Sequence, residues 1–151
     1  MSSFKKMTHI TLRTAGIWIV ARHILLECLV DGDTWGVPGG KLELDETAEE
    51  GCLREYREEL GLEMQCIRLA VLHENFYAGA YGRVREHCFY FLVQPKHGTV
   101  HAPMPVVSRE PQLRFAWFPL DDLAGLKFVP AALKPVLPDL GSGTQFLSTV
   151  E

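Results

Sequence analysis

Apolar runs separated by turn residues predict strands on both sides of a single long amphipathic helix. Segments rich in β-branched, aromatic and other apolar residues are expected to form strands at 8–22, 23–30, 63–77, 84–94 and 113–118. The segments 63–77 and 84–94 flank a glycine-containing loop, so we expect them to pair as an antiparallel hairpin. Prolines limit two short helices, which we expect near residues 119–123 and 131–137.

The long helix is expected to begin at Glu46 or Thr47 and to end at Leu60. Its apolar positions recur at helical spacing and form one stripe: Ala48, Cys52, Leu53, Tyr56 and Leu60. Thr47 and Glu50 have the spacing of a capping box, and Asp45 is an alternative N-cap. Gly61 is well placed to follow the last helical residue in the left-handed conformation.

The order of the elements predicts an α/β (α+β) layer fold with a mixed, partly antiparallel sheet. A chain of 151 residues has the length of one domain and can bury a core without disulfides. We therefore expect a single domain over residues 1–151. The extremities are predicted to be mobile ends, at residues 1–7 and 141–151.

Composition and charge narrow the classes of partner. Apolar residues make up 47% and charged residues 23% of the chain, which is ordinary for a globular protein. A formal charge of -4 argues against stable nucleic-acid binding, although a bound cation would still allow an anionic substrate. No apolar stretch reaches the ~18 residues of a membrane span. The cysteines form no CxxC pair and no signal peptide is recognisable, so we expect a cytoplasmic protein.

Acidic residues gather in and around the long helix. Nine of the 19 acidic residues of the chain lie in the segment Glu43–Glu63. Glu58 and Glu59 follow Glu55 at spacings of three and four, which place like charges on one face of a helix. They also lie at its C-terminal end, where the helix dipole favours cations. A solvated acidic face is the simpler interpretation, but the cluster favours a divalent cation held by oxygen ligands.

Nine residues of this stretch follow a fixed spacing: Gly40, Glu46, Arg54, Glu55, Tyr56, Glu58, Glu59, Gly61 and Leu62. They resemble the signature of the Nudix hydrolases, G-x5-E-x7-R-E-U-x-E-E-x-G-U, in which U is a bulky apolar residue. The one departure is Tyr56, where an aliphatic residue is usual. Similarity to this MutT-like family implies an α/β/α sandwich. It also implies hydrolysis of a nucleoside diphosphate linked to another moiety, with Mg²⁺ or Mn²⁺ as the cofactor.

The resemblance implies roles for individual acidic residues. Glu55, Glu58 and Glu59 resemble the metal ligands of the family, and the Gly40 carbonyl resembles a further ligand. Glu58 and Glu59 are also expected to be catalytic. A later loop often supplies an additional acid in this family, and Glu110 is the candidate here because it precedes a predicted strand.

Other residues are expected to support the site. Arg54 and Glu46 resemble an ion pair that orients the loop against the helix, and Glu43 is either a supporting carboxylate or a surface charge. Glu74 and Glu86 are rivals of Glu110, because both lie on strands expected to border the cleft.

The substrate is expected to be a nucleoside tri- or diphosphate. Tyr81 is a candidate for contact with the nucleotide and Arg83 for contact with phosphate, with core packing and a solvated strand end as the alternatives. No proline occurs between Pro38 and Pro95, which weighs against resemblance to ADP-ribose hydrolases. Tyr77 lies near the position of a tyrosine in dinucleoside-polyphosphate hydrolases.

Several alternatives stay open. Dinucleoside polyphosphates, nucleotide sugars and ADP-ribose are alternative substrates. A domain that senses nucleotides without hydrolysing them is a different class of function, but such domains tend to lose the glutamates that this chain retains. We expect a monomer or a homodimer.

Overall fold

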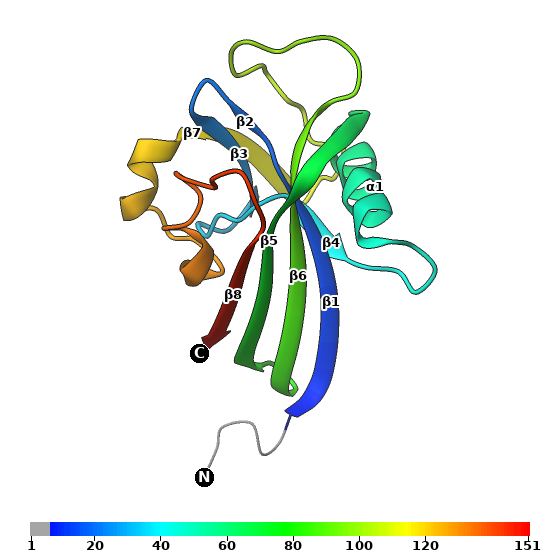
Figure 1. Ribbon diagram of the computed structural model, residues 1–151, viewed down its shortest axis with the longest axis vertical. Helices are drawn as coiled ribbons and strands as arrows, with labels where there is room; N and C mark the ends of the chain where they lie inside the picture. The colour runs from blue at the N-terminus through cyan, green and yellow to red at the C-terminus, as the bar shows by residue number, and fades with distance from the viewer. Residues whose placement is uncertain (1–6) are drawn as a thin grey trace.

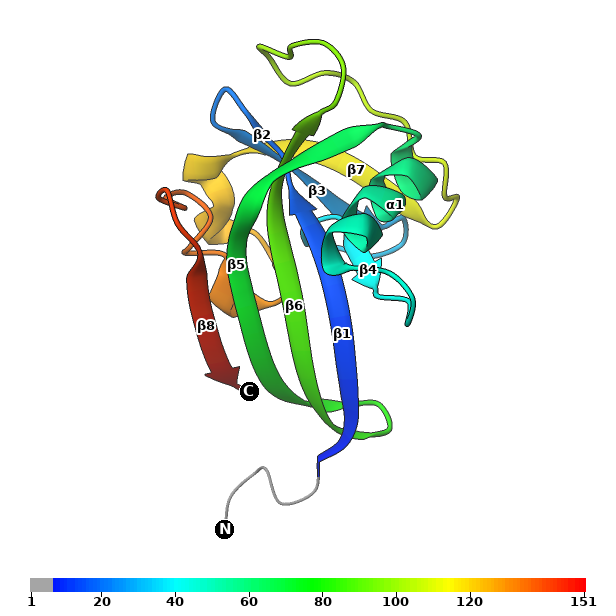
Figure 2. The same ribbon diagram turned by 45° about the vertical axis from the view of Figure 1, so that its right-hand side comes forward.

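The computed structural model describes residues 7–151, which form two β-sheets with helical segments on both sides (Figures 1 and 2). Strand order is β4-β1-β6-β5-β8 in the larger sheet and β2-β3-β7 in the smaller one. The strands are β1 (Met7–Ile17), β2 (Ile19–Val20), β3 (His23–Leu29), β4 (Gly39–Lys41), β5 (Met64–Gly79), β6 (Gly82–Pro95), β7 (Leu113–Pro119) and β8 (Gln145–Val150). The helical segments are α1 (Ala48–Leu60) and the 3₁₀ helices η2 (Leu120–Gly125) and η3 (Ala131–Leu133). This arrangement confirms the predicted α/β layer fold.

The larger sheet is mixed because its strands pair in both directions. β1 runs parallel to β6, with Ile10 opposite Arg85 and Ile17 opposite Leu92. β5 and β6 pair antiparallel around the turn at Ala80–Tyr81, so the predicted hairpin is confirmed. The main apolar core lies between the two sheets, and a second cluster lies beneath α1.

The helix α1 has the predicted termini. Thr47 Oγ1 accepts a hydrogen bond from the Glu50 N–H, and a Glu50 carboxylate oxygen accepts one from the Thr47 N–H, both at 3.0 Å. Gly61 has a φ of 66° and follows the helix in the left-handed conformation. Within the described residues, no helix has the length and apolar character needed to cross a membrane.

Tyr56 holds α1 against β1. Its ring is buried, and its hydroxyl donates a hydrogen bond of 2.7 Å to the Gly16 carbonyl. A Cβ atom at position 16 would lie 2.5 Å from the Tyr56 ring, so glycine is required where the ring crosses the strand. The residue that departs from the usual aliphatic type is therefore accommodated by a complementary glycine.

The chain is ordered where we expected a mobile end from residue 141 onward. Gln145–Val150 forms β8, which runs parallel to β5 with Val71 opposite Gln145 and Phe76 opposite Val150. The polar composition of this segment gave no signal of a strand, but its side chains alternate between half-buried and exposed positions. Pairing along the edge of β5 stabilises it. Of the other predicted mobile end, residues 1–6 lie outside the described part, and residue 7 begins β1.

Candidate active site

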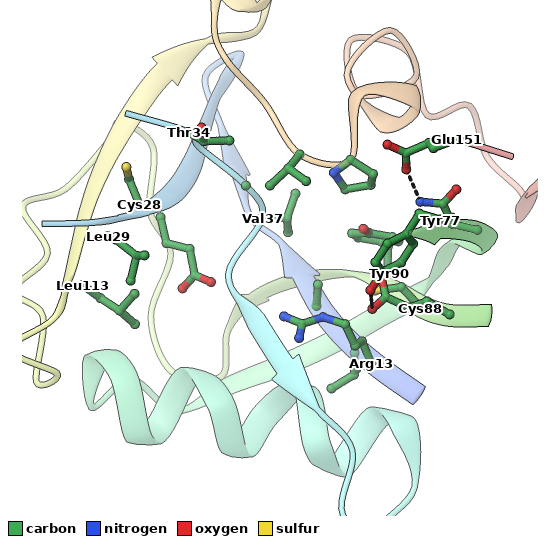
Figure 3. A pocket seen from close by; sticks show the side chains of 18 residues that line it. Arg13, Cys28, Leu29, Thr34, Val37, Tyr77, Cys88, Tyr90, Leu113 and Glu151 are labelled. Atoms are coloured by element: carbon green, nitrogen blue, oxygen red, sulfur yellow. Dashed lines mark hydrogen bonds between the residues drawn. The ribbon is translucent and has the colours of Figure 1, made fainter. Parts of the chain in front are cut away.

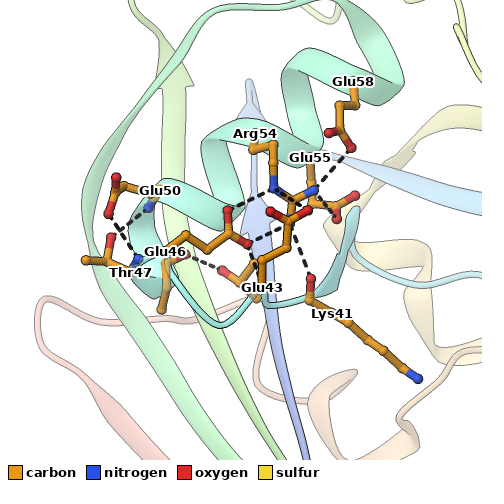
Figure 4. A network of polar contacts seen from close by, with 10 residues as sticks. Lys41, Glu43, Glu46, Thr47, Glu50, Arg54, Glu55 and Glu58 are labelled. Atoms are coloured by element: carbon orange, nitrogen blue, oxygen red, sulfur yellow. Dashed lines mark hydrogen bonds and ion pairs between the residues drawn. The ribbon is translucent and has the colours of Figure 1, made fainter.

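Arg54 lies at the centre of a network of carboxylates on α1 and the preceding loop (Figure 4). Its Nε and Nη2 atoms donate to the two Glu46 carboxylate oxygens at 2.9 and 2.7 Å, so the predicted ion pair is present and bidentate. Its Nη1 atom donates to Glu55 Oε1 at 3.0 Å and to Glu58 Oε2 at 3.1 Å. Hydrogen bonding to Arg54 lowers the pKa of Glu46 to about 2.

The same network fixes the loop before the helix. Glu46 Oε1 accepts a hydrogen bond of 2.9 Å from the Glu43 N–H, and Arg54 Nη2 donates to the Lys41 carbonyl at 3.3 Å. The Glu43 carboxylate lies 3.9 Å from Arg54 Nε and is exposed. Glu43 therefore contributes its backbone to the network more directly than its charge.

Glu59 lies in the opposite environment, buried beside Glu27 of β3. It is only 6% exposed, and burial, with the charge of Glu27 as the next cause, raises its pKa to about 11. Burial also raises the pKa of Glu27 to about 7, against the lowering effect of hydrogen bonds with Glu59 and the Gly39 backbone. The Oε2 atoms of both residues are buried without a hydrogen-bond partner. These two carboxyl groups form a buried acidic pair.

Glu27 is a site residue that sequence reasoning missed. It lies inside the segment HILLECLV, where it is the one acidic residue in an otherwise largely apolar run. That isolation was the available signal, because an acidic residue is rarely placed among buried apolar residues without a partner. Only the fold, which brings the Glu27 side chain of β3 to Glu59 of α1, shows which partner it has.

The donor set fits a divalent cation. Among residues 7–151, no group of three or more His, Cys, Asp or Glu side chains is arranged to hold a metal ion as it stands. Arg54 is one reason for this arrangement, because its guanidinium forms ion pairs with two of the predicted ligands, Glu55 and Glu58. The available oxygens are nevertheless hard ligands, and the orphan Oε2 atom of Glu59 is buried beside them. A Cβ atom at Gly40 would lie 2.4 Å from Glu55 Oε1, so glycine brings the backbone against a predicted ligand.

The loop that contains Glu110 reaches the end of α1. The Arg109 N–H donates a hydrogen bond of 2.7 Å to the Glu59 carbonyl, which ties this loop to the acidic helix. The Glu110 carboxylate accepts a hydrogen bond of 3.4 Å from Gln112 Nε2. The two alternative candidates for the additional acid lie elsewhere. The Glu74 carboxylate accepts a hydrogen bond from the Ser148 hydroxyl and lies 3.5 Å from Arg85 Nη1. Glu86 lines a cleft between the two sheets.

A cleft of about 520 Å³ lies between the two sheets, beside Glu27 (Figure 3). Its polar lining includes Arg13 of β1, Tyr77 of β5 and Glu86 of β6. Glu86 Oε1 accepts hydrogen bonds of 3.1 Å from both the Tyr77 hydroxyl and Thr11 Oγ1. The cleft therefore joins Glu27 to a polar wall of the larger sheet.

The predicted nucleotide contacts are not at this cleft. Tyr81 is 90% exposed in the β5–β6 turn, which both views place at the far end of the sheet from α1 (Figures 1 and 2). Arg83 lies two residues further along, opposite Ala78 at the same end of the hairpin. The glycine-flanked loop that suggested nucleotide contact is a tight strand connection, so neither residue is carried into the proposed site.

The chain matches the family model described as the NUDIX domain over residues 7–140. It therefore belongs to the Nudix family, and the resemblance seen in the sequence is confirmed. The MutT protein from Bacillus halodurans shares the fold: its crystal structure aligns with a TM-score of 0.67 at 19% identity. That alignment covers 93% of this chain and 89% of the other.

Curated relatives are longer than the matched region. The nucleoside triphosphate pyrophosphatase/Nudix hydrolase fusion protein of Bifidobacterium longum is 25% identical over 146 residues, 97% of this chain and 26% of that protein. The 8-oxo-dGTP diphosphatase of Proteus vulgaris is 46% identical over 46 residues, 30% of this chain and 41% of that protein. The matched region thus spans between 26% and 41% of the length of the curated relatives.

Proposed function

We propose that this chain is a metal-dependent pyrophosphohydrolase that cleaves a phosphoanhydride bond by attack of water on phosphorus. The proposed substrate is a nucleoside tri- or diphosphate. One observation carries the proposal: Glu27 lines the cleft beside the buried Glu59, and the Oε2 atom of each side chain is buried without a hydrogen-bond partner. Uncompensated buried carboxylates are unfavourable unless positive charge is supplied. Mg²⁺ or Mn²⁺ would supply that charge.

In this proposal, Glu55, Glu58, Glu59 and the Gly40 carbonyl hold the cation. The bound cation would lower the pKa of a water molecule and screen the phosphate oxygens. Arg54 keeps Glu55 and Glu58 together, because its other N–H groups are fixed by the scaffold and only Nη1 contacts them.

Two acids are candidates for the base that takes a proton from the attacking water. The Glu58 side chain is 53% exposed, so water and substrate have access to it. Glu110 is the alternative, because its loop is hydrogen-bonded to the Glu59 carbonyl through Arg109. A base must come within hydrogen-bond reach of the water it activates, and both positions border the end of α1.

The test is product release from a panel of nucleotides with and without Mg²⁺. The panel contains nucleoside tri- and diphosphates, a dinucleoside polyphosphate, a nucleotide sugar and ADP-ribose. Hydrolysis that requires Mg²⁺ supports the proposal. Tight nucleotide binding without hydrolysis of any member would instead support a sensor domain. The dinucleoside polyphosphate is included because Tyr77, the residue that suggested this substrate, lines the cleft.

Glu58→Gln tests the site in parallel, with Glu49→Gln as its matched control. Glu49 is an exposed residue in the first turn of the same helix, so the control makes the same substitution away from the acidic end. We expect Glu58→Gln to lower turnover by at least about tenfold, the effect of about 1.4 kcal/mol in transition-state stabilisation. Unchanged turnover in Glu58→Gln would remove this residue from the proposed site.

A further inference from the structure

Arg13 presents a positive charge to the cleft without an acidic side chain bound to it. The residue is half-buried, and Figure 3 shows its side chain among those that line the cleft. Within residues 7–151, none of the side-chain hydrogen bonds or ion pairs involves its guanidinium group. Arg85 of the same sheet offers a contrast, because its Nη1 atom lies 3.5 Å from Glu74. An unpaired guanidinium at a half-buried site is a ready binding group for an anion.

The neighbours of Arg13 include Glu27 on one side of the cleft and Tyr77 of its polar wall on the other. The positive charge of Arg13 opposes the rise that burial causes in the pKa of Glu27, and it does the same for Tyr77. Along the strand, Arg13 lies opposite Lys41 of β4, and its neighbour Thr14 lies opposite Gly40. Adjacent strands are about 4.8 Å apart, so the Arg13 backbone is close to the glycine loop that leads into the acidic helix.

We propose that the Arg13 guanidinium binds the phosphoryl group on the nucleoside side of a diphosphate substrate. This inference rests on the proposed function, because it assumes that the other phosphoryl group lies at the carboxylates of Glu55, Glu58 and Glu59. A planar guanidinium can donate two parallel hydrogen bonds to phosphate oxygens, which fixes orientation as well as charge. The nucleoside would then extend toward Tyr77 and Glu86, at the polar wall of the cleft.

A purely structural role makes different predictions. If Arg13 only offsets the charge of Glu27, its removal would lower the stability of the fold and leave substrate affinity unchanged. If it binds phosphate, its removal would raise the dissociation constant of a diphosphate and the KM of the substrate. The affinity for Mn²⁺ would not fall in that case, because removing a nearby positive charge does not weaken the binding of a cation.

The experiment compares wild type with Arg13→Gln, Arg13→Lys and the matched control Arg85→Gln. The probe is methylenediphosphonate, a pyrophosphate analogue that resists hydrolysis, and its binding is measured by calorimetry in Mg²⁺. Thermal unfolding, Mn²⁺ affinity and the KM for the best nucleotide of the panel are measured on the same proteins. Arg85 is a suitable control because it lies on the same sheet but is absent from the lining of the cleft.

We expect Arg13→Gln to raise the dissociation constant of the probe and the KM about tenfold or more, the usual effect of losing a charged hydrogen bond. Arg13→Lys should lie between Arg13→Gln and wild type, because it keeps the charge but not the two-pronged geometry. Arg85→Gln should resemble wild type. If Arg13→Gln does not fold, Arg13→Lys carries the test: a raised KM supports the contact, and an unchanged KM overturns it.

The outcomes separate this inference from the proposed function. If wild type hydrolyses nucleotides and Arg13→Gln binds the probe as wild type does, the role of Arg13 is overturned and the proposed function stands. If wild type hydrolyses no member of the panel but Arg13→Gln still weakens binding of the probe, the proposed function fails and the anion site stands. Equal losses in Arg13→Gln and Arg85→Gln would also overturn the inference, because they would indicate a general effect of charge.

Discussion

Glu46 and Glu59 belong to the same signature, but the fold gives them opposite environments. Glu46 forms a bidentate pair with Arg54, and its pKa falls to about 2. Glu59 is buried against Glu27, and its pKa rises to about 11. The first carboxylate is held by a charge of the scaffold itself. The second has no ion pair with a basic side chain among the described residues, and its Oε2 atom is buried without a hydrogen-bond partner, as is typical of groups at functional sites.

This comparison separates a supporting role from a reactive one. The Arg54–Glu46 pair joins the helix to the preceding loop and is complete without any ligand. The Glu27–Glu59 pair leaves the Oε2 atom of each side chain buried without a hydrogen-bond partner, and in the proposed function a bound cation would complete it. Substitutions of the two pairs should therefore affect different properties of the protein.

The largest expected effect is the loss of activity in Glu59→Gln. A bound cation contributes several kcal/mol of transition-state stabilisation, and each 1.4 kcal/mol is about tenfold in rate, so we expect a loss of kcat/KM of at least ~100-fold. The metal-free protein should not become less stable, because an uncompensated buried acid is replaced by a neutral amide. Steady-state kinetics and urea unfolding measure the two effects, with Glu49→Gln as the control. Activity within a few-fold of wild type in Glu59→Gln would contradict the assignment.

A smaller effect is expected in the pH dependence of the metal-free protein. The pKa of Glu27 is raised from 4.5 to about 7, so its contribution to stability is present below pH 4.5 and is lost as the pH rises through 7. The pKa of Glu46 is lowered from 4.5 to about 2, so its contribution is present above pH 4.5 and is lost as the pH falls through 2. The pKa of Glu59 rises to about 11, so Glu59 adds to the decline above pH 4.5, and the free energy of unfolding should decline on both sides of about pH 4.5.

Two variants and one addition sharpen this pH profile. Glu46→Gln should remove part of the acidic decline and leave the alkaline decline in place. Glu27→Gln should do the reverse. Mg²⁺ should stabilise wild type at pH 8 by about 2.7 kcal/mol at a concentration 100 times its dissociation constant. Urea unfolding at a series of pH values measures all three, and an alkaline decline that persists fully in Glu27→Gln would contradict its cause.

The smallest effect is expected at the far end of the sheet, in Tyr81→Ala. Its side chain is 90% exposed in the β5–β6 turn, so we expect a change in unfolding free energy within about 0.5 kcal/mol and an unchanged KM. Thermal unfolding and steady-state kinetics provide the measurement. A several-fold rise in KM would show that this turn reaches the substrate after all and would restore the original prediction.

Local patterns predicted much of the fold. The capping box of Thr47 and Glu50, the left-handed Gly61 and the β5–β6 hairpin follow from short-range spacing and were confirmed. The strand Gln145–Val150 was not predicted, because its stability comes from pairing with β5 rather than from its own composition. A segment that is ordered by a distant edge carries little local signal.

The sequence by itself determined the acidic cluster of α1, because the spacing of Glu55, Glu58 and Glu59 on one helix is a local property of the chain. Only the tertiary structure decided which residues face this cluster. Arg13 and Glu27 lie on strands of different sheets, and their positions depend on the pairing of β1 with β4 and of β3 with β7. Burial and the charges of neighbours set the pKa of each carboxylate, and both depend on contacts between segments distant in the chain.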